Sequence, residues 1–134
     1  MKMVLVLSLI SSLWGKAFSF SPDLEVLPAG DFEHHCLTRK VYSLMVDTRP
    51  DPDAGAPALK GAVHVPFGAD FLKRLDDALD ARNAPKSVLI FLYTEDAAAT
   101  EALLEWLKVQ LAEKPKTSHK VQMVYVRAGG LEAQ

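Results

Sequence analysis

The stretch from Ser87 to Tyr93 (SVLIFLY) constrains the fold more than any other part of the sequence. Its apolar residues follow one another without a break, instead of alternating with polar residues. A strand of this kind is buried on both faces, as strands are in a parallel sheet that helices cover on two sides. The sequence therefore predicts a fully buried central strand at this position.

The rest of the chain alternates between strand-like and helical patterns. Further strands are predicted at residues 23–27, 42–47, 62–66 and 120–126. Helices are predicted at 32–38, where Asp31 should cap the first turn, and at 70–80 and 96–113. Strands that alternate with helices are connected by right-handed crossovers, so we expect an α/β fold, a small parallel sheet with helices on both faces.

Composition excludes several classes of function. The formal net charge is −2, so the chain has no basic surplus for binding nucleic acid. Cys36 is the only cysteine, which excludes an intrachain disulfide and a multi-cysteine metal centre. His34, His35 and Cys36 are adjacent, and neighbours on a helix point about 100° apart and cannot close one site. We predict no metal and no cofactor, and expect Cys36 to be buried or to face a partner.

Residues 1–22 differ from the predicted domain at 23–134. They contain Lys2 and Lys16 but no acidic residue, and the uncharged run from 3 to 14 is too short for a bilayer, which takes about 20 apolar residues. The segment could be a signal peptide, a transit peptide, an uncleaved anchor, or a helix packed on its own domain. The anchor is favoured, and its docking side chains would be Leu5, Leu9, Leu13, Trp14, Phe18 and Phe20.

Four segments, in order, are similar to the rhodanese-like family. Residues 46–49 (VDTR) resemble that family's strand ending in Asp-x-Arg, and residues 60–67 (KGAVHVPF) resemble its Pro-Gly-Ala segment. The helix at 70–80 follows, and residues 124–131 (VYVRAGGL) resemble the closing strand and its Gly-Gly turn. The resemblance covers about residues 24–134 and implies a single rhodanese-like domain. Asp47 and Arg49 are expected to form a structural ion pair.

The resemblance also implies an active-site loop of the type Cys-x-x-Gly-x-Arg, whose thiolate attacks sulfur and whose backbone N–H groups hold an anion. The corresponding residues here are Leu92, Tyr93, Thr94, Glu95, Asp96 and Ala97. Leu92 stands at the nucleophile position and has no nucleophilic atom, while Glu95 replaces the glycine and Ala97 the arginine. These departures predict that the domain is not an enzyme, neither a sulfurtransferase nor a phosphatase.

Two functions follow from this interpretation. The favoured one is an accessory or structural subunit that binds other protein subunits of a larger assembly, a mitochondrial membrane complex of the respiratory-chain or ATP-synthase type, with lipid contact through residues 3–20. The alternative is a soluble module that binds a small ligand or a protein in the vestigial pocket at 92–94. The expected location is the mitochondrial inner membrane, or the secretory pathway if residues 1–20 are a signal peptide.

Overall fold

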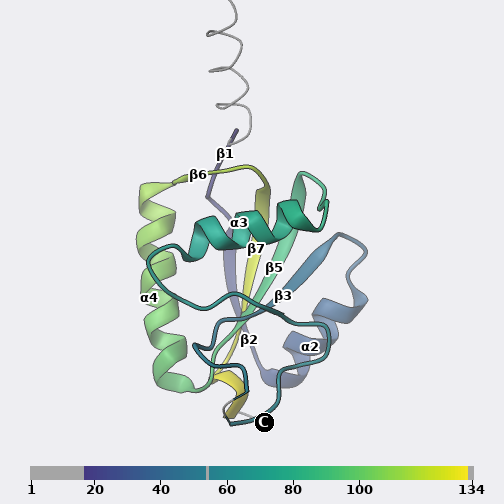
Figure 1. Cartoon of the computed structure of the whole chain (residues 1–134), viewed down its shortest axis with the longest axis vertical. Helices are drawn as coiled ribbons and strands as arrows, with labels where there is room; N and C mark the ends of the chain where they lie inside the picture. Colours follow the sequence, from purple (N-terminus) through teal and green to yellow (C-terminus); the bar gives the residue numbers. More distant parts are fainter. Residues whose placement is uncertain (1–16, 54, 133–134) are drawn as a thin grey trace, which may run out of the picture.

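Five parallel strands make up the main sheet of the computed structural model, which describes residues 17–53 and 55–132 (Figure 1). In sheet order they are β2 (Asp23–Leu27), β7 (Lys120–Arg127), β5 (Ser87–Tyr93), β3 (Ser43–Asp47) and β4 (Val63–His64). The helices of the described residues are α2 (Ala29–Thr38), α3 (Phe71–Ala81) and α4 (Ala97–Glu113), and a 3₁₀ turn, η1, covers Gly130–Glu132. This confirms the predicted α/β class and the parallel sheet.

The central strand β5 is buried on both faces, as its sequence predicts. Val88, Ile90 and Leu92 pack in a cluster with residues of α3 and α4, whereas Leu89 and Phe91 pack on the opposite face with Phe32 of α2. Successive side chains of a strand point to opposite faces, so one apolar run supplies two cores. The helices therefore cover the sheet on both sides.

All strands of the main sheet run in the same direction, which gives the sheet two chemically different edges. The carboxyl edge is where β3, β5 and β7 end, at Asp47, Tyr93 and Arg127. The amino edge is where β5 and β7 begin, at Ser87 and Lys120. Loops that follow the strands in open α/β sheets gather at the carboxyl edge, and this is where such folds place their sites.

The helix starts only partly match the sequence predictions. Asp96 caps α4, because its side chain accepts a hydrogen bond from the backbone N–H of Ala99. Asp31 does not cap α2: the helix begins earlier, at Ala29, with Pro28 at the cap position, and Asp31 lies in its first turn. The carbonyl of Pro28 accepts the first bond, from the N–H of Phe32. Pro28 has a φ of −57° and a ψ of 156°, the extended conformation that is typical of a residue at the cap position.

Residues just before β2 belong to the domain, which corrects the predicted boundary after residue 22. Strand β1 (Phe18–Ser19) pairs antiparallel with β6 (Lys116–Thr117), and the N–H of Phe20 donates to the carbonyl of Pro115 at 2.8 Å. The side chain of Phe20 is 2% exposed and fills the core beside α3 and α4. The proposed docking role of Phe20 is therefore wrong, because its ring is buried in its own domain.

The other predicted docking side chains have different outcomes. Phe18 is half-buried on β1. Leu5, Leu9, Leu13 and Trp14 lie outside the described residues. None of the helices within residues 17–53 and 55–132 combines the length and the apolar character needed to cross a bilayer.

Replacing Phe20 with alanine should lower the free energy of unfolding by about 3–5 kcal/mol, because the ring leaves a cavity in the core. Val109→Ala is the control, since Val109 is 51% exposed on α4. Denaturant titration of the full chain followed by circular dichroism measures both. A Phe20→Ala protein as stable as Val109→Ala would show that residues 17–22 do not contribute to the core.

Candidate functional site

A buried ion pair lies at the carboxyl end of β3. The guanidinium of Arg49 donates through Nη2 and Nε to Asp47 Oδ2, at 2.8 and 3.1 Å, and the two side chains are 2% and 1% exposed. Arg49 also donates to the carbonyls of Ala56 and Pro52, at 2.5 and 2.9 Å. This confirms the structural pair expected from the sequence. It also ties the loop that follows β3 to the end of that strand.

Tyr93, at the end of β5, joins this pair to a second part of the same loop. Its hydroxyl donates to Asp47 Oδ2 at 3.0 Å and accepts from the N–H of Leu59, also at 3.0 Å. Burial, followed by the nearby Asp47 carboxylate, raises the pKa of Tyr93 to about 12. The hydroxyl therefore keeps its proton and can act as a donor throughout the neutral range.

The charge state of Asp47 follows from its partners. Burial alone raises the pKa of a carboxyl, but here hydrogen bonds from the side chain and backbone of Arg49, and from Tyr93, outweigh burial. The pKa of Asp47 is consequently held below its ordinary value of 3.8. Asp47 is ionised at neutral pH, and the positive charge of Arg49 is balanced.

The loop predicted from the resemblance begins inside β5. Leu92 is 1% exposed in the core on the α3 and α4 side, and Tyr93 points to the other face, so neither side chain reaches the loop surface. Thr94 is the first residue beyond the strand. Its hydroxyl bonds Thr100 Oγ1 at 2.6 Å and the carbonyl of Asp96 at 2.9 Å.

The side-chain carboxylate of Asp96 caps the amino end of α4, where an anionic ligand could otherwise bind. Asp96 Oδ1 accepts from the N–H of Ala99 at 2.9 Å. Free N–H groups and the helix dipole make such an end attractive to anions. Here the Asp96 carboxylate already accepts a hydrogen bond from one of these N–H groups, and Glu95 adds a second negative charge beside it.

The turn after β7 closes over this loop. The N–H of Leu131 donates to the carbonyl of Thr94 at 2.8 Å, and the N–H of Glu132 donates to the carbonyl of Glu95 at 3.3 Å. Gly130 has a φ of +69°, and a Cβ there would come within 2.5 Å of the backbone nitrogen of Asp96. Only glycine allows this close approach, which explains the Gly-Gly turn seen in the sequence.

A cavity of about 220 Å³ opens beside this loop, between the ends of β3 and β5 and the start of α4. Among the described residues of its wall, Glu95 is the only ionisable one, and none is basic. Of the predicted lining residues 92–94, only Thr94 takes part. The lining residues are Thr48, Pro50, Phe67, Thr94, Glu95, Ala99 and Ala102.

Sequence reasoning missed most of these lining residues. Phe67 belongs to the segment that follows β4, and its ring lies 5.6 Å from that of Trp106 and 5.9 Å from that of Phe71, in edge-on contacts. Trp106 therefore packs at the rim of the core. One sequence signal could have identified Phe67. It follows the Val-Pro pair at residues 65–66, just after the predicted strand that ends at the carboxyl edge of the sheet.

Acidic residues outnumber basic ones among the loops and turns of the carboxyl edge, where the cavity lies. The described acids in the loops and turns at this edge are Asp51, Asp53, Glu95, Asp96 and Glu132. The basic residues at this edge are Lys60, Arg49 and Arg127. Asp47 neutralises Arg49, and Arg127 pairs with Glu33 at 3.2 Å. The field at the cavity mouth is therefore negative, and it favours a cationic or neutral guest over an anion.

Cys36 is remote from this site. It is half-buried on α2, in the cluster on the opposite face of the sheet, and burial raises the pKa of its thiol. Residues 94–97 contain no thiol, so a cysteine nucleophile is not available in this loop. Within the part of the chain that the structure describes, no three histidine, cysteine or acidic side chains gather to hold a metal ion.

Comparisons with known proteins support the fold. No protein-family model matches the sequence, and no curated protein matches it. The structure is similar to that of Ygr203w, described as a yeast protein tyrosine phosphatase of the rhodanese family, with a TM-score of 0.55 and 12% sequence identity. The match covers 80% of this chain and 81% of that chain. The chain has a rhodanese-like fold.

The similarity to this rhodanese-family structure corrects the prediction about enzymatic activity. The chain was predicted not to be an enzyme, and the matched protein of the same fold is described as a phosphatase, which contradicts that prediction. The prediction rested on the absence of a cysteine from residues 92–97. That absence excludes a thiolate of this loop and nothing more, because other groups can also act as nucleophiles.

The ionised Asp47 should make the stability of the domain dependent on pH. Its folded pKa lies below its unfolded value of about 3.8, so its stabilising effect is complete above that pH and is lost as the pH falls through the folded pKa. Asp47→Asn should lower the free energy of unfolding at pH 7 by about 3–5 kcal/mol, because Arg49 remains buried without a counter-charge. The variant should also lose less stability on acidification than the wild type.

Denaturant titrations from neutral to acid pH measure both effects, with Asp77→Asn, an exposed residue of α3, as the control. The control should follow the wild-type curve. An Asp47→Asn protein with unchanged stability at neutral pH would contradict the role given to the buried pair.

Proposed function

We propose that this rhodanese-like domain serves as an accessory subunit that uses its acidic carboxyl edge to contact another protein subunit of a larger assembly. The observation that supports the proposal is a cavity with a negatively charged wall. Its volume is about 220 Å³, and its described lining residues include Glu95 and no basic residue. A lysine or arginine side chain of a partner has the charge and size to enter such a cavity.

The self-capped helix supports this choice of partner. An anionic ligand at the start of α4 would meet the carboxylates of Asp96 and Glu95, and Asp96 already bonds the N–H of Ala99. Repulsion between like charges within a few ångströms disfavours that ligand, whereas a cation is attracted. The network of Asp47, Arg49 and Tyr93 holds the neighbouring loop in place, so the cavity needs little reorganisation when a partner binds.

The identity of the assembly stays a prediction. A membrane complex of the mitochondrial inner membrane is the expected setting, with the secretory pathway as the alternative. Attachment through the apolar residues 3–16 also stays a prediction, since these residues lie outside the described structure.

The cavity also favours a second candidate, a module that senses a small cationic or neutral ligand. The same negative field and the same lining would serve such a ligand. The two candidates differ in the partner: an accessory subunit migrates with other proteins on a native gel, whereas a sensor migrates alone.

Glu95→Lys should release the domain from its assembly, because the new ammonium group repels a basic partner at the cavity mouth. The backbone bond from Glu132 to the carbonyl of residue 95 does not involve the side chain, so the fold should persist. Tagged full-length chain is expressed in the source cells and its co-migration on native gels is measured.

The matched control is Glu105→Lys, which makes the same charge change at an exposed position in the middle of α4, away from both edges of the sheet. It should leave co-migration unchanged. If Glu95→Lys still co-migrates like the wild type, the contact with the assembly lies elsewhere on the chain and the proposal fails.

A further inference from the structure

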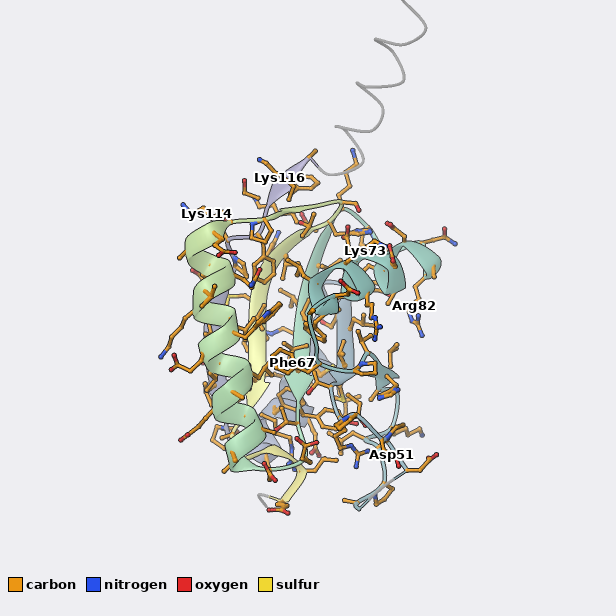
Figure 2. The ribbon with its side chains drawn as sticks, turned by 60° about the vertical axis from the view of Figure 1, so that its left-hand side comes forward. Asp51, Phe67, Lys73, Arg82, Lys114 and Lys116 are labelled. Atoms are coloured by element: carbon orange, nitrogen blue, oxygen red, sulfur yellow. The ribbon has the colours of Figure 1, made fainter. Side chains whose placement is uncertain are left out.

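Basic side chains gather at the amino edge, at the opposite end of the domain from the candidate site. They either follow the ends of α2, α3 and α4 or precede β5 and β7, so the topology brings them to one end. The exposed basic residues of this end are Arg39, Lys40, Arg82, Lys86, Lys114, Lys116 and Lys120. Figure 2 shows Lys114 and Lys116 at one end of the domain and Asp51 at the other.

Few of these basic residues are neutralised by the domain. The acids near this end are Asp23, Asp70, Asp76, Asp77, Asp80 and Glu113; Asp80 is engaged with His119 at 2.7 Å, and Asp76 accepts from the N–H of Ser118 at 2.9 Å. Among the described residues, the ion pairs join other side chains and include none of the basic residues of this edge. The basic residues of the amino edge therefore slightly outnumber its acids, and two of those acids are engaged by His119 and Ser118, although the chain as a whole is slightly acidic.

The start of the described chain lies at this same edge. Phe18 and Ser19 pair with Thr117 and Lys116, and Lys116 Nζ donates to Ser19 Oγ at 3.0 Å. The residues before Ala17 include an uncharged apolar run with Lys2 on one side and Lys16 on the other, with no acid. In the sequence, the apolar run thus directly precedes the strand that lies at this basic edge.

We propose that the amino edge is a docking surface for an anionic lipid bilayer. Anionic headgroups attract clusters of basic side chains at a membrane surface, and each lysine or arginine adds to the binding free energy within a Debye length. Stable membrane attachment requires a second contribution, and the apolar run that precedes this edge in the sequence has the composition for it. This inference goes beyond the proposed function, because it assigns a partner to the face that the protein contact leaves free.

The proposal fixes an orientation. With the amino edge against the bilayer, the strands point away from the membrane, because all of them begin at that edge. The acidic carboxyl edge then faces the aqueous side, away from the repulsion of anionic headgroups. The two ends of the domain would bind two different partners at the same time.

The test is co-sedimentation of the full chain with vesicles of phosphatidylcholine and phosphatidylserine, compared with vesicles of phosphatidylcholine alone. The wild type should bind the anionic vesicles more tightly, and added salt should weaken that binding because it screens the charges. Lys120→Glu should weaken binding to anionic vesicles about fivefold or more, since each basic residue near such a surface contributes a factor of about five. Binding to neutral vesicles should not change.

The matched control is Lys60→Glu, the same charge change in the loop at the carboxyl edge, and it should bind as the wild type does. Circular dichroism verifies that both variants are folded. Equal binding to both kinds of vesicle, or a Lys60→Glu effect as large as that of Lys120→Glu, would overturn the proposal. Binding to soluble heparin without binding to vesicles would also overturn it, and would point to an acidic macromolecule instead.

The purified chain suffices for this experiment, so its result is independent of the protein partner. A protein that fails to bind vesicles but still loses its assembly on Glu95→Lys would refute the membrane surface alone.

Discussion

The buried pair of Asp47 and Arg49 organises the carboxyl edge of the sheet. Arg49 is almost fully buried and bonds to the backbone of the following loop, so its charge must be balanced within the domain. Tyr93 completes the arrangement, because its hydroxyl joins Asp47 to the N–H of Leu59. Three side chains from the ends of two adjacent strands thereby hold the segment that forms one wall of the cavity.

Charge is divided between the two ends of the sheet. Loops after the strands carry acids such as Asp51 and Glu95, while the segments before the strands carry lysines such as Lys86 and Lys120. The net charge of −2 conceals this division, because the two ends nearly cancel. The parallel topology keeps the two kinds of charge apart, because every strand of the main sheet begins at one edge and ends at the other. We propose that this polarity orients the domain between a lipid surface and a basic protein partner.

The fold followed from the sequence because its strongest signals are local. The apolar run at 87–93 and the helical pattern at 96–113 both act through neighbouring residues, and both the predicted strand and the predicted helix are confirmed. Phe20 could not be placed in the same way. An aromatic residue in an apolar leader looks like an anchor, and only the pairing of β1 with β6, about a hundred residues away in the chain, brings it into the core. The cavity wall escaped prediction for the same reason, since Phe67 and Thr48 meet Thr94 only in the folded domain.

An NMR titration of the labelled full chain with benzylamine and with benzoate tests most directly whether the cavity is a site for cations. The two molecules have similar shape and opposite charge, so the comparison isolates the effect of Glu95 and its neighbours. Benzylamine should shift the amide resonances of Thr94, Glu95 and Ala99, and benzoate should leave them in place. Shifts of these resonances with benzoate and none with benzylamine would contradict a site for cations.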